Sequence, residues 1–231
     1  MSDDAHKITT PLEVLGVMAS QNVMLTPTLR HIEMYTMKGL LSALWHEPTT
    51  DLFSAGVVTC GGAMGGLLGP GEGLYHELGQ KLSARGVPTL RVSYRRPNDM
   101  DACCVDVAAA VQLLVGSGVE RVVIMGHSFG GAVAVRVAVA LPDIVAGVVT
   151  FSTQSAGCEI AGGLNGRPLL LFHGDKDEIL PVEASEVVKA IAGHGDLHIM
   201  SSDGHLLTHS QQAMLDILLP WLDEVLGLHP G

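Results

Sequence analysis

A serine lies between two glycines at residues 126–130, which have the sequence Gly-His-Ser-Phe-Gly. The segment follows an apolar stretch and precedes a run of small residues, so it predicts a sharp turn between a strand and a helix. Such a turn projects the serine oxygen into a cleft, and glycine fits the crowded positions Gly126 and Gly130. The pattern favours Ser128 as a nucleophile. A glycine-rich turn without chemistry is the alternative interpretation of these five residues alone.

A serine nucleophile needs a general base, and a histidine follows the last expected strand. That strand covers residues 196–200, and His205 lies after it on a loop. His194 precedes the strand, at the opposite edge of the sheet, and His198 lies inside it. His209 is expected about one turn into the final helix and remains a second choice. The position therefore favours His205 as the base.

An acid is needed to orient that base, and three acids follow the expected strand at residues 168–173. They are Asp175, Asp177 and Glu178. Residues just past the carboxyl end of a strand lie at the edge of an α/β sheet where ligands bind. Turn and helix-capping roles suit Asp175 and Glu178 better than Asp177.

Backbone N–H groups must stabilise the negative oxygen that forms when a serine attacks a carbonyl group. We expect one from Phe129, directly after Ser128, and another from the glycine-rich loop at residues 61–66. The loop lacks the lysine of G-x-x-x-x-G-K-[ST], and the chain contains no G-x-G-x-x-G, so nucleotide binding is disfavoured.

Expected strands and helices alternate along most of the chain, after an antiparallel hairpin. This order predicts an α/β fold with a mostly parallel central β-sheet and helices on both faces. Right-handed crossovers then bring the carboxyl ends of the strands to one edge. The expected strands are residues 31–36, 39–45, 55–60, 88–94, 121–126, 144–151, 168–173 and 196–200, and the expected helices are residues 72–85, 99–115, 128–140, 182–192 and 205–226.

The domain organisation follows from the same alternation. Residues 31–231 are expected to form a single domain, and the chain of 231 residues is long enough for one sizeable core. Residues 1–30 are expected to form an N-terminal arm or a short helix. Within them, residues 11–25 are the candidate helix, and Pro27 would end it.

These segments resemble the α/β-hydrolase fold superfamily over roughly residues 31–226. The resemblance implies a Ser-His-Asp triad in the chain order nucleophile, acid, histidine. It assigns the acid to Asp177, because residues 173–181 resemble the pattern H-G-x-x-D-x-x-x-P. The compact size is similar to small carboxylesterases and dienelactone-hydrolase-like members.

The glycine-rich loop resembles the H-G-x or H-G-G loop of the family, and this resemblance makes Gly62 the best donor, with Ala63 close behind. Cys60 stands where histidine is common in the family, and Ser128 stands where dienelactone hydrolases proper carry cysteine.

The expected activity is hydrolysis of carboxylic esters through an acyl-enzyme, with no cofactor and no metal. Thioesterase, acyltransferase, peptidase and perhydrolase activities would use the same triad. A different class remains open, because function depends on the site and not on the fold. A catalytically silent binding protein with a hydrolase fold is that alternative.

The expected cleft is open. Only about 16 residues separate Phe151 from the next strand, which is too few for a cap domain. An open cleft suits a small or short-acyl ester. Arg95 and Arg96 follow a strand and are expected to be solvated or paired with acids rather than to bind an anionic substrate. The candidate substrate contacts are Met64, Leu67, Leu68, His127 and the ring of Phe129.

The composition excludes several classes of protein. The net charge is −11, which argues against nucleic acid and anionic membrane surfaces as partners. No apolar stretch reaches the ~18 residues of a membrane span. Residues 1–10 do not resemble a secretory signal, so a cytoplasmic protein is expected. The four cysteines are expected to be reduced, the scattered histidines predict no metal site, and monomer and homodimer both remain open.

Overall fold

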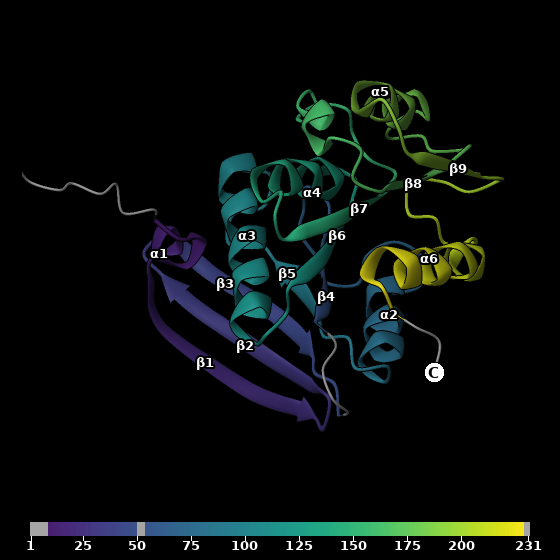
Figure 1. Cartoon of the computed structure of the whole chain (residues 1–231). Helices are drawn as coiled ribbons and strands as arrows, with labels where there is room; N and C mark the ends of the chain where they lie inside the picture. The colour runs from purple at the N-terminus through teal and green to yellow at the C-terminus, as the bar shows by residue number, and fades with distance from the viewer. Residues whose placement is uncertain (1–8, 50–53, 229–231) are drawn as a thin grey trace, which may run out of the picture.

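In the computed structural model, residues 9–49 and 54–228 are described, and their strands form one nine-stranded sheet. The strands are β1 Val17–Thr26, β2 Leu29–Thr36, β3 Gly39–His46, β4 Ala55–Cys60, β5 Thr89–Ser93, β6 Arg121–His127, β7 Val145–Phe151, β8 Leu169–Gly174 and β9 Asp196–Met200. Their order in the sheet is β1-β2-β3-β5-β4-β6-β7-β8-β9 (Figure 1). The pairs β1–β2, β2–β3 and β3–β5 are antiparallel, and the remaining pairs are parallel.

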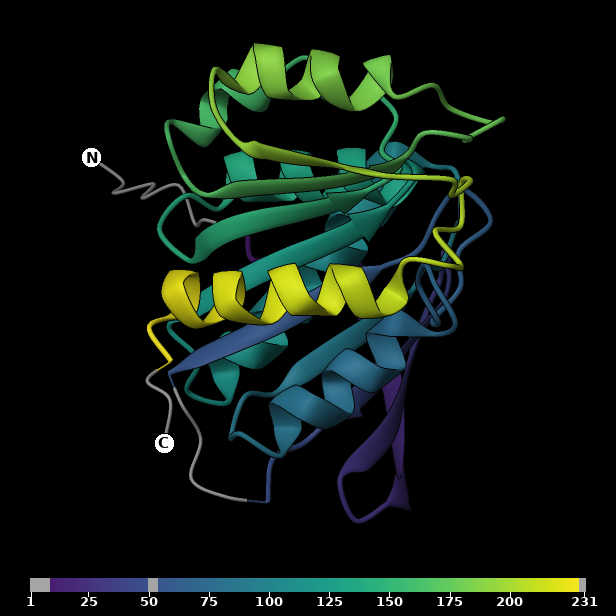
Figure 2. The same cartoon turned by 90° about the vertical axis from the view of Figure 1, so that its right-hand side faces the viewer.

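Helices cover both faces of the parallel part of the sheet. They are α1 Pro11–Leu15, α2 Leu74–Ser83, α3 Met100–Gly116, α4 Phe129–Ala140, α5 Glu183–Ala192 and α6 Gln211–Leu226, with a short 3-10 helix at Ala161–Leu164. Figure 2 shows α2 and α6 in front of the sheet and α3 and α4 behind it. This arrangement confirms the expected fold class.

The parallel strands are apolar on both sides because both sides are covered. Every residue of β4 is buried. On one face Val58 and Ile124 pack with side chains of α3 and α4, and on the other Val57 and Val123 pack with side chains of α2 and α6. Burial of each such side chain stabilises the fold by roughly 1.5–3 kcal/mol.

The N-terminal region differs from the expected helix or arm over residues 11–25. The helix α1 covers only Pro11–Leu15 and ends at Gly16, whose φ is 64°. The next ten residues form β1, which pairs with β2, and Pro27 lies in the turn between these strands. All of β1 is exposed, so its side chains do not alternate between apolar and polar as in a half-buried strand. The sequence pattern therefore lacked the period that predicts a strand.

The last helix begins later than expected. It starts at Gln211, and residues 205–210 form a loop, so His209 precedes the helix instead of lying one turn inside it. Leu207 has a φ of 54°, which a right-handed helix does not allow. The buried carboxylate of Asp203 organises the loop, because it accepts the N–H groups of Gly204 and His209, both at 3.0 Å.

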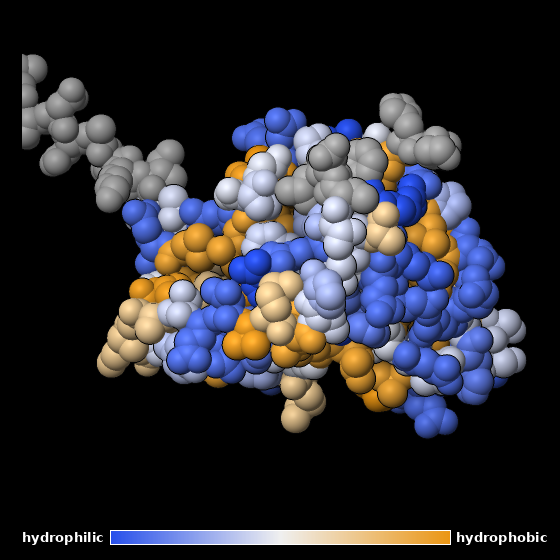
Figure 3. Space-filling model, turned by 90° about the horizontal axis from the view of Figure 1, so that it is seen from below, coloured by the Kyte–Doolittle hydropathy of each residue, from blue (hydrophilic) through white to orange (hydrophobic). Residues whose placement is uncertain are grey.

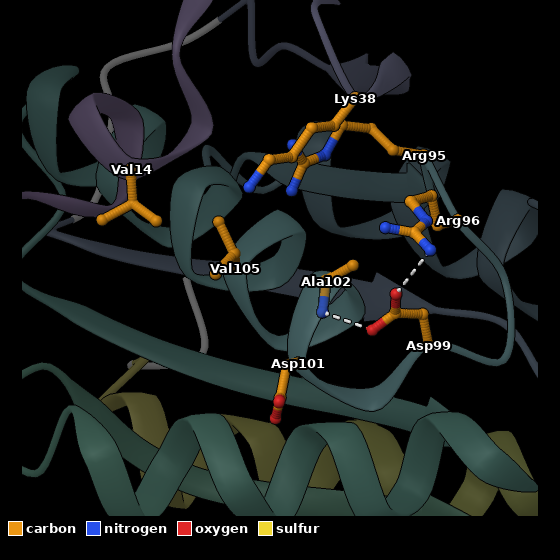
Figure 4. Close-up of a pocket in the computed structure, with 8 residues that line it drawn as sticks. All are labelled: Val14, Lys38, Arg95, Arg96, Asp99, Asp101, Ala102 and Val105. Carbon is orange, nitrogen blue, oxygen red and sulfur yellow. Dashed lines mark hydrogen bonds and ion pairs between the residues drawn. The ribbon is translucent and has the colours of Figure 1, made fainter.

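Both arginines after β5 pair with acids, as expected. Arg96 lies 3.3 Å from Asp99, on the wall of a pocket of about 250 Å³ (Figure 4). Arg95 is almost fully buried, and its Nε lies 2.5 Å from the fully buried carboxylate of Asp106 in α3. The backbone N–H of Arg95 donates to the same carboxylate at 2.8 Å. This pair ties the carboxyl end of β5 to α3.

Breaking the Arg95–Asp106 pair is expected to destabilise the fold strongly. Asp106→Asn leaves a buried guanidinium without a counter-charge, and such a loss costs about 3–5 kcal/mol of unfolding free energy. Urea denaturation measures this change. Asp101→Asn, an exposed position in the same helix, is the control and should change the unfolding free energy by less than about 0.5 kcal/mol. Equal effects of the two variants would contradict the prediction.

Candidate active site

Ser128 lies in a strained turn between β6 and α4. Its φ of 55° and ψ of −120° fall outside the conformations that residues with side chains usually adopt. The Ser128 N–H donates to the carbonyl of Phe151 at 2.8 Å, and its carbonyl accepts the N–H of Gly131 at 3.0 Å. A Cβ on Gly126 would overlap the carbonyl of Gly130. The strained conformation persists because hydrogen bonds and close backbone packing fix it from both sides.

Asp177 and His205 form a hydrogen-bonded pair. The distance between His205 Nδ1 and Asp177 Oδ2 is 2.8 Å. The Asp177 side chain is fully buried, and the His205 side chain is 11% exposed. A carboxylate only accepts hydrogen bonds, so the proton lies on Nδ1 and Nε2 is the nitrogen that can take another proton.

The Asp177 carboxylate is held in its charged form. Burial raises the pKa of Asp177, but hydrogen bonds from the Leu180 N–H, the His205 ring and the Ile179 N–H outweigh burial and lower it below its ordinary value. The two backbone bonds measure 2.9 Å from Leu180 and 2.8 Å from Ile179. Asp177 therefore stays negative at neutral pH.

Only one of the three candidate acids meets a candidate base. Asp175 is exposed, and its carboxylate accepts the N–H of Ser202 at 2.6 Å. Glu178 is exposed as well. In contrast, Asp177 points inward to His205.

The competing histidines lie elsewhere. His194 bonds through its ring to the carbonyls of Ala192 and Arg167, at 2.9 and 2.7 Å. His198 stacks on Phe172, with the ring centroids 5.6 Å apart. His209, the second choice, has a side chain that is 80% exposed and lies 3.5 Å from Asp203. Among the histidines in the described ranges, His205 alone both bonds to Asp177 and lines the cleft of Ser128.

One cleft of about 540 Å³ brings the candidate residues together. Ser128, His127 and His205 line it, with the glycine-rich loop and Ile179. The described part of the chain contains no hydrogen-bond partner for the Ser128 hydroxyl. Hydrogen bonds of this kind are often long before substrate binds and tighten in the complex.

The two expected oxyanion donors lie next to the serine. Phe129 is the first residue of α4, so its N–H has no acceptor within the helix. A Cβ on Gly62 would lie 3.5 Å from the Cβ of Ser128, which places this glycine at the nucleophile. Gly62 is also paired with Gly65, whose N–H donates to the Gly62 carbonyl at 2.9 Å.

Two buried tyrosines hold the glycine-rich loop, and sequence analysis did not single them out. The Tyr75 hydroxyl donates to the carbonyl of Cys60 at 3.1 Å, and the Tyr94 hydroxyl donates to that of Gly61 at 3.0 Å. Cys60 itself is buried at the end of β4, and burial raises the pKa of its thiol to about 12. It therefore packs as a neutral thiol below the loop.

Arg91 anchors the same loop from below and was also missed. Its Nη1 donates to the carbonyl of Leu67 at 3.1 Å, and its Nη2 lies 3.3 Å from His76 Nδ1. A guanidinium only donates, so His76 Nδ1 must be unprotonated here. Burial lowers the pKa of His76, which keeps that nitrogen an acceptor. The only signal in the sequence was an arginine in the middle of an expected strand, residues 88–94.

Most of the expected substrate contacts line the cleft. Met64, Leu67, Leu68 and His127 all do so. The ring of Phe129 does not, and this expectation was wrong. It is 5% exposed and packs edge-on against Tyr94, with the ring centroids 6.3 Å apart. Phe129 is the first residue of α4, and its side chain packs in the core cluster on the α3 and α4 side of the sheet.

His127 links the serine turn to the loop that carries the base. Its Nε2–H donates to the backbone carbonyl of His205 at 2.9 Å, and the two ring centroids lie 4.9 Å apart. Burial lowers the pKa of His127 to about 4, so the ring is neutral at pH 7. The two chain segments, far apart in sequence, are therefore held together at the cleft.

His173 supports the loop of Asp177. The ring is buried, its Nε2–H donates to the carbonyl of Leu180 at 2.9 Å, and Nδ1 lies 2.7 Å from the Ser185 hydroxyl. Nε2 also lies 3.2 Å from Asp177 Oδ2. The sequence signal for this role was the first position of the pattern H-G-x-x-D-x-x-x-P, which the analysis used only to choose the acid.

Residues 9–49 and 54–228 contain no group of three or more histidine, cysteine, aspartate or glutamate side chains placed to hold a metal ion. Within these same ranges, no helix is both long and apolar enough to cross a bilayer. The four cysteines are free thiols.

Comparison with known proteins places the fold. Residues 106–220 match the family described as Phospholipase/Carboxylesterase. Est1E from Butyrivibrio proteoclasticus superposes with a TM-score of 0.71 at 18% identity, over 85% of this chain and 99% of that chain. A dienelactone hydrolase from Anabaena variabilis gives a TM-score of 0.71 at 16% identity, over 89% of this chain and 98% of that one.

A third structure is XC6422 from Xanthomonas campestris, described as an α/β serine hydrolase without lid. It superposes with a TM-score of 0.70 at 16% identity, over 90% of this chain and 100% of that chain. The chain has the α/β-hydrolase fold. No curated protein matches this α/β-hydrolase in sequence. The family match favours a hydrolase, and the structural neighbours show the fold.

The low pKa of His127 is expected to make the stability of this α/β-hydrolase depend on pH. Between pH 6.5 and 4 the unfolded chain binds a proton at this ring that the folded chain does not. The free energy of unfolding should therefore fall as pH falls through this range. Near pH 5 His127 should account for on the order of 1–2 kcal/mol of the loss. The charged and titratable groups that face this ring are His205, Asp177 and His173, and none of them is substituted in the test.

Urea denaturation at about pH 7 and about pH 5 measures this effect. His127→Asn should lose less unfolding free energy between the two conditions than the unsubstituted protein. His209→Asn removes an exposed imidazole and should behave like the unsubstituted protein. The same loss in all three proteins would exclude His127 as the source.

Proposed function

We propose that this α/β-hydrolase cleaves carboxylic esters through an acyl-enzyme formed on Ser128. One observation carries the proposal. A single cleft holds a serine on a strained strand-to-helix turn together with a histidine that is hydrogen-bonded to a buried carboxylate. A nucleophile, a base and a group that orients the base are the parts that acyl transfer by serine requires.

In the proposed reaction, the Ser128 Oγ attacks the ester carbonyl carbon while His205 Nε2 takes the hydroxyl proton. Asp177 stabilises the imidazolium that forms. The negative oxygen is stabilised by the N–H of Phe129 and by the N–H of Gly62. His205 then gives its proton to the leaving alcohol oxygen as the C–O bond breaks. Water, deprotonated by His205, attacks the acyl carbon, and His205 returns this proton to the Ser128 Oγ as the ester bond breaks and the acid is released.

The lining of the cleft supports a small ester with an apolar acyl group. Large apolar side chains from three loops surround its mouth, and they are well exposed: Met64 93%, Leu68 64%, Ile179 70% and Leu206 56%. Residues 152–168 between β7 and β8 hold only a short 3-10 helix, so no cap domain closes the site there. An open site of this kind suits short acyl chains.

Thioesterase, acyltransferase, peptidase and perhydrolase activities use the same groups and remain alternatives within the proposal. A silent binding protein would not need a buried carboxylate paired with the ring of His205 at the cleft of Ser128. The first experiment therefore asks whether the serine is activated at all.

Ser128→Ala is expected to lower kcat/KM for p-nitrophenyl acetate and butyrate by at least about 1,000-fold, because the nucleophile is lost. A fluorophosphonate probe should label the unsubstituted protein and not this variant. Ser201→Ala, an exposed serine on the loop before His205, is the control and should keep both activity and labelling. Labelling without ester turnover would point to another acyl-transfer reaction. The absence of both labelling and turnover would favour the binding protein.

The apolar rim is expected to contribute to acyl-chain preference. Met64→Ser should lower kcat/KM for the butyrate ester roughly threefold to tenfold and change the acetate ester less, because the longer chain gains more from apolar contact. Met37→Ser removes another highly exposed methionine, at 84%, from the turn between β2 and β3 and serves as the control. An equal loss with both esters would indicate that Met64 acts on the loop and not on the acyl chain.

A further inference from the structure

The sheet of this protein ends in an uncovered strand. β1 is the first strand in the sheet order and pairs only with β2, so its other edge has no partner among residues 9–49 and 54–228. Figure 1 shows it as the outermost strand of the antiparallel part, away from α3 and α4. Its free N–H and C=O groups form a ready template for another strand.

This strand is apolar as well as exposed. All ten of its residues are exposed, and five of them are large and apolar: Val17 37%, Met18 61%, Val23 59%, Met24 46% and Leu25 54%. Seen from below, apolar side chains gather over the part of the molecule that carries β1, on the left in Figure 3. Single exposed apolar side chains are ordinary, whereas several on one strand indicate an interaction surface.

The features that normally protect an edge strand are absent from its centre. Val17–Thr26 contains no Lys, Arg, Asp, Glu or Pro, although the chain carries 24 acidic and 13 basic residues. The pairing of β1 with β2 is regular from Ala19 to Met24, and the irregularities lie at its two ends. Copies with a charge of −11 repel one another in general, and an uncharged strand is a place where two copies meet without opposing like charges.

The residue types of β1 are symmetric about Gln21. Going outward from Gln21, Ser20 matches Asn22, Ala19 matches Val23, Met18 matches Met24 and Val17 matches Leu25. In an antiparallel pair with Gln21 on a two-fold axis, these matched residues face each other across the two copies. Polar then meets polar and apolar meets apolar, and a two-fold interface requires such self-complementarity.

We propose that a second copy of this chain pairs antiparallel along β1, with Gln21 opposite Gln21, so that one sheet continues through a homodimer. The loops that form the cleft follow β4, β6, β8 and β9, so pairing through β1 leaves both clefts free. The proposal is independent of the reaction proposed for the cleft.

Light scattering during size-exclusion chromatography tests the association, and cysteine cross-linking tests the register. The unsubstituted protein should have twice the chain mass of 24.2 kDa. Under mild oxidation Gln21→Cys should form a disulfide-linked dimer, because facing Cβ atoms lie about 4.5–5.5 Å apart. Val23→Cys should not, because the two copies of this residue would be displaced by four positions, about 13 Å.

A charge substitution tests the same interface without cross-linking. Gln21→Lys places two like charges across the axis and should weaken the dimer at least about tenfold in Kd. Gln212→Lys, at an exposed position in α6, should remain dimeric. Circular dichroism checks that both variants are folded. A monomeric unsubstituted protein, a dimeric Gln21→Lys, or equal cross-linking of the two cysteine variants would overturn the proposal.

Discussion

The close approach of three backbone segments around Ser128 is the constraint on which the cleft depends. Side chains at Gly126 and Gly130 would overlap neighbouring carbonyls, those of Gly130 and Gly61 respectively. The serine turn, the start of α4 and the glycine-rich loop can therefore meet only because these positions lack a Cβ. The strained φ of Ser128 is a result of that meeting, and the surrounding hydrogen bonds hold it.

Two buried groups near this centre are held in different charge states, one charged and the other neutral. Asp177 is buried and yet kept charged, because two backbone N–H groups and the ring of His205 donate to it. His127 is buried and kept neutral, so it can bond to the His205 carbonyl without adding a positive charge next to the base. The local environment thus keeps one buried carboxylate charged and one buried imidazole neutral around the same cleft.

The sequence predicted the parallel core of the fold because burial on both faces leaves continuous apolar strands between helices. The ranges 55–60 and 196–200 match β4 and β9. β1 escaped prediction because none of its residues is buried, and a strand without a buried face has no period to detect. The late start of α6 escaped because a buried acid, Asp203, organises the preceding loop through tertiary contacts.

Site residues whose roles follow from motifs and chain order could be predicted, whereas those whose roles depend on packing could not. Ser128 and His205 were chosen by their places after strands, and Asp177 by the resemblance of its segment to the pattern H-G-x-x-D-x-x-x-P. The structure brings Asp177 to His205 and both histidines of the cleft to Ser128. Tyr75, Tyr94 and Arg91, which hold the glycine-rich loop, carry no motif, because their roles depend on hydroxyl and guanidinium groups that reach backbone carbonyls across the sheet.

The mouth of the cleft has a further consequence. Its apolar side chains, such as those of Met64 and Leu206, have no role in the proposed chemistry, while tyrosine hydroxyls hold the base of one loop from inside the fold. The surface that would meet a ligand can therefore accumulate substitutions with little effect on the reacting groups. A scaffold divided in this way can change its ligand range by altering a few loop positions, while the core and the serine turn remain under strict steric selection.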